Sequence, residues 1–411
     1  MRLTSWTIHQ VYFFVAIFVV SFLANDLAGQ VIWDRAQIDR TRNGEYDKDS
    51  QVALAVNRLK KAADSALKNE LYSVTHKEGV PPSGDIHDYL SYSRYWWPDP
   101  KKPDGLPFIR KDGVSNDEQI AKGDRDRLGK FQNDVQTLGL AGYVLKEPRY
   151  TRHAVKLVRA WFIDEATYMN PNLNYAQGVP GREDGRSFGI IDVRGFMLVL
   201  DTVELFDETN WTAEDQAALR SWFDEFQQWL GENPLGQKEA SATNNHGTWF
   251  AAQRARYALF VGREDIAREI VQGARQRLAT QFDAEGNQAA ELKRTRALFY
   301  SVFNITAMSR VARVGEHIDE NLWEFIPQHG CGMQKAFEGL LPYITGESKW
   351  PHAQMKEFYL TNDSRMTFGL FSKHFEDDKY NKAAEKVRET EGATRDFTAI
   401  VMGEPQSGKS K

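Results

Sequence analysis

The chain has 411 residues, of which 41% are hydrophobic and 27% charged, an ordinary globular composition that excludes disorder throughout. A formal net charge of −5 makes nucleic acid an improbable partner, because neutralising phosphates requires a basic surface. Cys331 is the only cysteine, so no intramolecular disulfide can form and side-chain burial must stabilise the fold.

The first predicted element is the apolar run VYFFVAIFVVSFLA at residues 11–24, preceded by Arg2 and followed by small residues up to Gly29. This pattern is typical of a secretory signal peptide. As a helix the run would span only ~21 Å, short of the ~30 Å hydrocarbon core, which disfavours a permanent anchor. We therefore expect a signal peptide at residues 1–29, no stable membrane anchor after its cleavage, and a bacterial protein that is periplasmic or secreted.

The remaining chain is predicted to be helical almost to its end. Residues 52–74 repeat apolar side chains at spacings of three and four, as one buried helix face requires. The short links between such patterns are rich in Gly, Pro, Asp and Asn, so successive helices should run antiparallel. No fixed sequence repeat is visible, which leaves a bundle or a ring of helical hairpins. Further helices are predicted at residues 130–146, 150–164, 194–206, 212–230, 247–260, 264–281, 288–313, 331–344 and 351–372.

Two long stretches, at roughly 76–118 and 167–191, lack the helical pattern. Connections of this length in a compact domain are usually functional or disordered, and these are too aromatic for disorder. They are therefore the predicted walls of a binding cleft. We expect one domain over residues 30–400, followed by a polar C-terminal tail at 401–411.

The segment SATNNHGTWF at residues 241–250 places Asn244, Asn245 and His246 where a helix begins. Thr243 or Asn244 could cap that helix by accepting from its free N–H groups. One cap needs only one such side chain, so the cluster exceeds the structural requirement. It is a candidate ligand site, with a solvated loop of no function as the alternative.

The segment ELKRTRALFY at residues 291–300 lies inside the predicted helix 288–313. Arg296 and Tyr300 are four residues apart and would share a helix face, whereas Arg294 would lie about 120° away from Tyr300. Glu291 and Arg294 could form an ordinary intrahelical pair. A solvated basic face beside a half-buried tyrosine is the structural alternative to a functional role.

The segment YWWPDP at residues 95–100 is the third candidate. Pro98 and Pro100 prevent a helix, so both tryptophans should lie on an extended segment. Aromatic rings on such a loop can lie flat against the apolar faces of sugars. A tryptophan that anchors the loop in the core is equally compatible with the pattern.

Four segments in this order, YWWPDP, MNPNLNYAQGVPG at 169–181, NNHGTWFAAQ at 244–253 and ELKRTRALFY, resemble the alginate lyase superfamily of polysaccharide lyases. The resemblance implies a single all-α domain, an (α/α) toroid of antiparallel helical hairpins. It also implies a monomeric enzyme that cleaves a polyanionic uronic-acid polysaccharide, alginate (poly-mannuronate) or glucuronan, by β-elimination. Neither a metal nor another cofactor is expected.

The resemblance also assigns roles to residues. Asn245, His246 and an arginine would neutralise the substrate carboxylate, and Tyr300 would be the acid/base. The family places this arginine seven residues before the tyrosine. Here Arg294 is six before and fits the Glu-x-x-Arg context, whereas Arg296 fits the helix geometry; we favour Arg294. In mannuronate and glucuronate the hydrogen on carbon 5 and the leaving oxygen lie on the same side of the sugar ring. Tyr300 could therefore take the proton and also return it to the leaving oxygen. Guluronate would need a second base, for which His246 is the candidate.

Further residues on the two loops, or beside the catalytic candidates, are predicted to bind substrate. Arg94, Arg110 and Lys111 could add a local positive field for a polyanion. The substrate-binding candidates are Tyr95, Trp96, Trp97, Asn172, Tyr175, Gln177, Asn244 and Arg296.

Two other functions stay open at the level of sequence. An inverting glycoside hydrolase on a helical toroid would need two carboxylates ~6.5–9.5 Å apart, and Asp and Glu are abundant. A periplasmic carbohydrate-binding protein could use the same aromatic loops without turnover. A metal hydrolase is disfavoured because the nine histidines are scattered without a ligand pattern.

Overall fold

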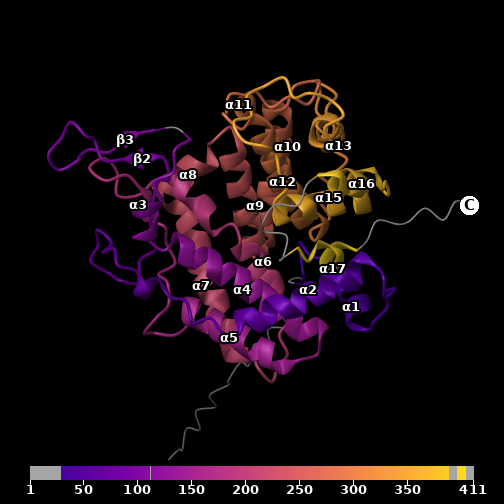
Figure 1. The fold of residues 1–411 in the computed structure, drawn as a ribbon, viewed down its shortest axis with the longest axis horizontal. Helices are drawn as coiled ribbons and strands as arrows, with labels where there is room; N and C mark the ends of the chain where they lie inside the picture. Colours follow the sequence, from indigo (N-terminus) through magenta and orange to yellow (C-terminus); the bar gives the residue numbers. More distant parts are fainter. Residues whose placement is uncertain (1–28, 112, 388–395, 404–411) are drawn as a thin grey trace, which may run out of the picture.

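The computed structural model describes residues 29–111, 113–387 and 396–403. The predicted signal peptide therefore lies, except for Gly29, outside the described residues. Across the described chain the regular secondary structure is mostly helical (Figure 1). Its longer helices are α2 (Gln51–Ala66), α4 (Arg125–Val144), α5 (Pro148–Phe162), α7 (Ala213–Glu232), α9 (Asn245–Phe260), α10 (Glu264–Gln281), α12 (Ala297–Glu316) and α15 (Asn362–His374).

Shorter elements complete the chain. They are α1 (Arg35–Arg42), α3 (Asp117–Ala121), α6 (Phe196–Val203), α8 (Pro234–Ala240), α11 (Ala289–Leu292), α13 (Met333–Glu338), α14 (Leu341–Ile344), α16 (Lys379–Lys386), α17 (Thr398–Met402) and the 3-10 helices η1 (Val74–His76) and η2 (Ser187–Val193).

Consecutive helices form hairpins because the links between them are short. Residues 145–147 join α4 to α5, and residues 261–263 join α9 to α10, so each pair must run antiparallel. Helix α9 also packs along α12, α7 and α8 (Figure 1). The predicted antiparallel hairpins are thus present.

Two glycines allow helix α4 to approach its neighbours closely. A Cβ at Gly139 would lie 2.1 Å from Thr202 Cγ2 on α6, and one at Gly142 would lie 2.2 Å from Thr151 Oγ1 on α5. No side chain fits at either position. Glycine is therefore required where α4 meets both helices.

Most of the abundant aromatic residues fill the core. Phe131 stacks on Trp161 with ring centroids 4.5 Å apart, and Phe162 meets Trp222 edge-on at 4.7 Å. All four side chains are at most 5% exposed. Core packing is thus the role of these rings, because burying large apolar side chains contributes most of the favourable free energy of folding.

A buried carboxylate fixes the start of the described chain. Asp201 on α6 is fully buried and accepts hydrogen bonds from the backbone N–H groups of Val31, Ile32 and Trp33, at 3.2, 2.7 and 2.8 Å. It also pairs with the fully buried Arg256 of α9, 3.1 Å away. The N-terminal strap, residues 31–33, is therefore tied to the centre of the molecule.

The two predicted non-helical stretches carry four short strands and lie together. Strand β1 (Leu90–Tyr92) pairs in parallel with β4 (Tyr175–Gly178), which joins the first stretch to the second. Strand β2 (Trp96–Trp97) pairs antiparallel with β3 (Ile109–Arg110) to form a hairpin that projects beyond α8 (Figure 1). Pro98 follows β2 directly and Pro100 comes two residues later, as expected for residues that end a strand.

Several element boundaries differ from the sequence prediction. The helix predicted at 52–74 ends at Ala66, and the one predicted at 331–344 is divided into α13 and α14. The predicted helix 288–313 is interrupted between α11 and α12, and residues 351–361 are not helical, so α15 begins only at Asn362. Helix α17 continues to Met402, and Val401 and Met402 are buried. The predicted tail therefore cannot begin at residue 401, because these two side chains belong to the core.

Candidate active site

The first turn of α9 explains the cluster of two asparagines and a histidine. Asn244 is the N-cap, and its side-chain oxygen accepts from the backbone N–H of His246 at 3.1 Å. One residue thus does the capping. The side chains of Asn245 and His246 are left for other contacts, and the alternative of a solvated loop is wrong because Asn245 is only 1% exposed.

Asn245 is held by a buried carboxylate from another helix. Its backbone N–H donates to Glu291 Oε1 at 2.7 Å, and its Nδ2 donates to Glu291 Oε2 at 2.8 Å. The alternative of an intrahelical ion pair between Glu291 and Arg294 is not found among the described residues, where both oxygens of Glu291 accept from Asn245. Asn245 Oδ1 is buried and has no hydrogen-bond partner among the described residues, and Nδ2 has a second N–H besides the one donated to Glu291, so the amide can still accept and donate.

His246 is held in the same way by a second buried carboxylate. Its Nδ1 lies 2.6 Å from Oε1 of Glu239, which belongs to α8 and is 1% exposed. A carboxylate at Nδ1 favours the tautomer that carries its proton there, which leaves the lone pair on Nε2. The imidazole is also packed edge-on against Phe188, with ring centroids 4.9 Å apart. A half-buried, oriented imidazole can accept a proton or bind an anionic group once protonated.

Arg294 reaches Tyr300 because the helix is broken between them. Helix α11 ends at Leu292 and α12 begins at Ala297, so the backbone of Arg294 is not helical. Its guanidinium carbon lies 3.7 Å from the centroid of the Tyr300 ring. The spacing of six residues, which does not fit one face of a continuous helix, is thereby accommodated.

The surroundings of Tyr300 act on its acidity in opposite directions. Burial raises the pKa of Tyr300 above its ordinary value, whereas the positive charge of Arg294 lowers it. Among smaller effects, Tyr95 raises this pKa and Arg296 lowers it. Arginine charges therefore favour the phenolate in a site whose burial favours the neutral phenol.

Arg296 occupies a different position from the one predicted. It is the residue just before α12, so it does not share a helix face with Tyr300. Its guanidinium carbon lies 4.2 Å from the Phe299 ring centroid and 5.3 Å from that of Tyr359. Its Nε and Nη2 are buried without an acceptor among the described residues. Arg294, not Arg296, is therefore in contact with the tyrosine.

The N-terminal ends of α9 and α12 lie together. Besides the two bonds from Asn245 to α11, Trp249 packs against Phe303 with ring centroids 4.9 Å apart, and Phe303 contacts Tyr300 at 6.4 Å. The catalytic candidates are thus gathered at one end of this helix pair.

The tryptophans of the hairpin support positively charged side chains. The guanidinium carbons of Arg182 and Arg186 lie 5.1 and 6.0 Å from the Trp96 ring centroid, and Lys111 Nζ lies 4.8 Å from that of Trp97. Both rings are partly buried. They hold cations of the two loops as well as anchoring the hairpin.

Candidates on the second loop differ in how their side chains are used. Asn172 Nδ2 donates to Asp88 at 3.0 Å, and Gln177 Nε2 donates to Asp192 at 2.8 Å. Gln177 also has a φ of 50°, a left-handed conformation that is rare outside glycine. The Asn172 amide thus joins the two loops, whereas the Gln177 amide ties the second loop to η2. In the described part of the chain the partly buried Tyr175 has no side-chain hydrogen bond.

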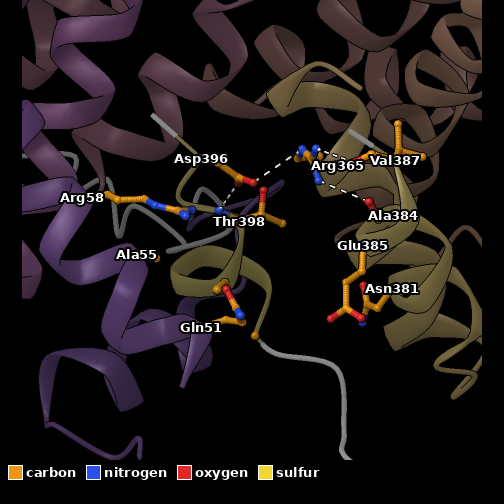
Figure 2. A pocket seen from close by; sticks show the side chains of 12 residues that line it. Gln51, Ala55, Arg58, Arg365, Asn381, Ala384, Glu385, Val387, Asp396 and Thr398 are labelled. Atoms are coloured by element: carbon orange, nitrogen blue, oxygen red, sulfur yellow. Dashed lines mark hydrogen bonds and ion pairs between the residues drawn. The ribbon is translucent and has the colours of Figure 1, made fainter. Parts of the chain in front are cut away.

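A separate cavity of ≈440 Å³ lies among α2, α15, α16 and α17 (Figure 2). Arg365 points into it, 3.6 Å from Asp396, and donates to the carbonyl of Ala384. None of the predicted site residues lines this cavity.

Within residues 29–111, 113–387 and 396–403, no group of three or more His, Cys, Asp or Glu side chains could hold a metal ion. In the same ranges no helix has the length and apolar character needed to cross a bilayer.

Sequence reasoning missed Glu239 and did not recognise the role of Glu291. Both are acidic residues in short helices whose burial no periodic pattern reveals. Their one signal is chemical, since a candidate histidine and a candidate asparagine each need an orienting acceptor.

The sequence model of the family described as Alginate lyase matches residues 73–350. The crystal structure of an alginate lyase from Bacteroides ovatus is similar, with 34% identity, a TM-score of 0.83, and coverage of 91% of this chain and 99% of that chain. No curated protein matches the chain significantly.

More distant structures share the fold. Alginate lyase A1-III from Sphingomonas species A1 is similar with 13% identity and a TM-score of 0.58, over 92% of this chain and 97% of that one. A variant of alginate lyase A1-III complexed with a tetrasaccharide gives 12% identity and a TM-score of 0.59, over the same shares. These likenesses confirm the predicted toroid of helical hairpins.

Proposed function

Because this chain belongs to the alginate lyase family and is thus a polysaccharide lyase, we propose that it cleaves a uronic-acid polymer by β-elimination, with Tyr300 moving the protons. Because the family consists of polysaccharide lyases, the alternatives of a glycoside hydrolase and of a non-catalytic binding protein are not needed to explain this site. The observation that carries the proposed mechanism is the contact of Arg294 with Tyr300, a cation 3.7 Å from the ring of a partly buried phenol.

The reaction removes the hydrogen on carbon 5 and expels the glycosidic oxygen on carbon 4, which leaves a carbon–carbon double bond. That hydrogen is hardly acidic while the adjacent carboxylate is ionised. In the proposed site Asn245, His246 and Arg294 bind the carboxylate and stabilise the developing enolate. The buried contacts of Asn245 and His246 with Glu291 and Glu239 support this assignment, because they hold both side chains in fixed orientations.

Tyr300 then acts twice. As phenolate it takes the proton from carbon 5, and as phenol it returns a proton to the leaving oxygen. One residue suffices for mannuronate or glucuronate, whose hydrogen and oxygen lie on one side of the ring. For guluronate the Nε2 lone pair of His246 is the proposed base on the opposite side.

The proposed function also includes a substrate and a cellular location. We propose alginate or glucuronan as substrate, with Tyr95, Trp96, Trp97 and Tyr175 in contact with sugars next to the reacting one. The family and the apolar run at residues 11–24 support export to the periplasm or the medium, and we propose that the enzyme acts as a monomer.

The test measures the ultraviolet absorbance of unsaturated uronate during incubation with poly-mannuronate, poly-guluronate, glucuronan and hyaluronan. We expect product from at least one polymer and none from the Tyr300→Phe variant, which should still bind oligosaccharide. The Tyr359→Phe variant is a matched control, because this tyrosine contacts Arg296 and not Arg294. Full activity of Tyr300→Phe would remove the proposed mechanism.

A further inference from the structure

The side chain of Arg186 lies between the hairpin and the catalytic histidine. Its guanidinium carbon is 4.6 Å from the Phe188 ring centroid, and Phe188 packs edge-on against His246 at 4.9 Å. On the other side it is 6.0 Å from the Trp96 ring centroid. One aromatic ring therefore separates this cation from the proposed carboxylate-binding residues.

The polar contacts of Arg186 fix its orientation but leave one guanidinium nitrogen, Nη2, without an acceptor among the described residues. Nη1 donates to Ser93 Oγ at 3.0 Å, and Nε lies 3.1 Å from the carboxylate of Glu183. Nη2 donates no hydrogen bond to any residue that the structure describes. The side chain is 20% exposed, so a ligand can reach it.

The charges around Arg186 favour an additional anion. Burial lowers the pKa of Arg186, and the nearby Arg110 lowers it further, whereas Glu183 and Glu239 raise it. Arg182 shares the Trp96 ring and donates its Nε to the carbonyl of Phe108 rather than to a carboxylate. Glu183 is 53% exposed, so solvent screens its charge. Like charges gathered in this way are stabilised by binding an anion.

We propose that Arg186 binds the carboxylate of the sugar next to the reacting one, and so makes a second uronate a requirement for efficient cleavage. The inference rests on the proposed function, because it places the reacting carboxylate at Asn245 and His246. A polyuronate carries one carboxylate per sugar, so the next anionic group lies one unit along the chain. A guanidinium fork matches a carboxylate better than an ammonium group does.

The aromatic neighbours have defined roles in this arrangement. Trp96 and Phe188 hold the guanidinium between two rings, which limits its rotamers before the ligand arrives. Phe188 also links its position to that of His246. Arg186 is therefore a specificity-determining residue that touches substrate, whereas the two rings position it.

The experiment compares kcat and KM of the full chain and of its Arg186→Gln and Arg186→Lys variants, on the polyuronate that the unmodified chain cleaves fastest. We expect KM to rise about tenfold in Arg186→Gln with kcat changed less than threefold, because a partly exposed ion pair is lost. Arg186→Lys should lie between the two. The increase of KM with added NaCl should become shallower in Arg186→Gln, since one charge no longer contributes.

Glu183→Gln is the matched control, because it removes the ion-pair partner of Arg186 and leaves the cation. We expect its KM to stay equal or to fall. A drop in kcat with unchanged KM in Arg186→Gln would mean that the residue acts only through Phe188 and His246, and would overturn the inference. Wild-type KM in Arg186→Gln would overturn it too. Absence of cleavage by the unmodified chain would instead reject the proposed function.

Discussion

Replacing Glu239 with glutamine tests the orientation of His246. The carboxylate is 1% exposed, lies 2.6 Å from His246 Nδ1, and leaves its Oε2 without a partner among the described residues. Glutamine keeps the shape and can still accept from Nδ1, but it removes the charge. A hydrogen bond to a charged group contributes about 1.5–3 kcal/mol and a neutral one about 0.5–1.5 kcal/mol.

The difference between these bonds, about 1–1.5 kcal/mol, corresponds to a five- to tenfold fall in kcat, if His246 carries more positive charge in the transition state than before it. Stability should change by less than about 1 kcal/mol, because an incompletely paired carboxylate is costly to bury. Initial rates from the ultraviolet absorbance of the product, together with urea unfolding, separate the two effects.

Glu232→Gln is the control for Glu239→Gln, because Glu232 is an exposed carboxylate close by in sequence. Its rate should equal that of the unmodified chain. Glu239 does not orient His246 for catalysis if Glu239→Gln keeps its rate within twofold, or if a loss of folded protein accounts for the whole loss of rate.

Three further predictions concern acidity, capping and burial. Because the charge of Arg294 lowers the pKa of Tyr300, Arg294→Gln should raise that pKa and move the ascending limb of kcat/KM to higher pH, measured from initial rates across a buffer series. Asn244→Ala removes the side-chain cap of α9 and should lower the free energy of unfolding by about 1 kcal/mol in urea titrations. Asp201→Asn leaves the buried Arg256 without its counter-charge and should cost about 3–5 kcal/mol, seen as a lower midpoint of urea unfolding.

The first two predictions would be contradicted by the following results, and the third has a matched control. If the ascending limb of the kcat/KM profile stays in place or moves to lower pH in Arg294→Gln, the charge of Arg294 does not lower the pKa of the catalytic base. Unchanged stability of Asn244→Ala would mean that solvent replaces the cap. The exposed pair of Asp224 with Arg263 provides the control for Asp201, since Asp224→Asn should cost at most about 1 kcal/mol.

The sequence predicts helices and loops well where one face is continuously buried. Residues 264–281 were predicted as a helix and α10 has the same bounds, because its apolar positions recur at helical spacing. The helix predicted at 288–313 was wrong at its start. Residues 293–296 contain no glycine or proline, and the break arises from long-range contacts such as the bridge between Arg296 and Gln354, which local patterns do not contain.

The candidate site shows the same limit. Residue types and their order pointed to Asn245, His246, Arg294 and Tyr300, and the roles assigned to them stay predictions. The capping function of Asn244 follows from its position before α9. The buried partner Glu239 could not be predicted, because its proximity to His246 depends on how α8 packs against α9 and not on any local pattern.

The long reach of Asp201 has a consequence for how the chain is made. The N–H groups of residues 31–33 find their acceptor 168 to 170 positions later, so during synthesis the earliest described residues wait until α6 has emerged. Contacts of such sequence separation slow the search for the native topology. Closure of this strap therefore cannot be among the first events of folding, because its acceptor on α6 is made about 170 residues after its donors.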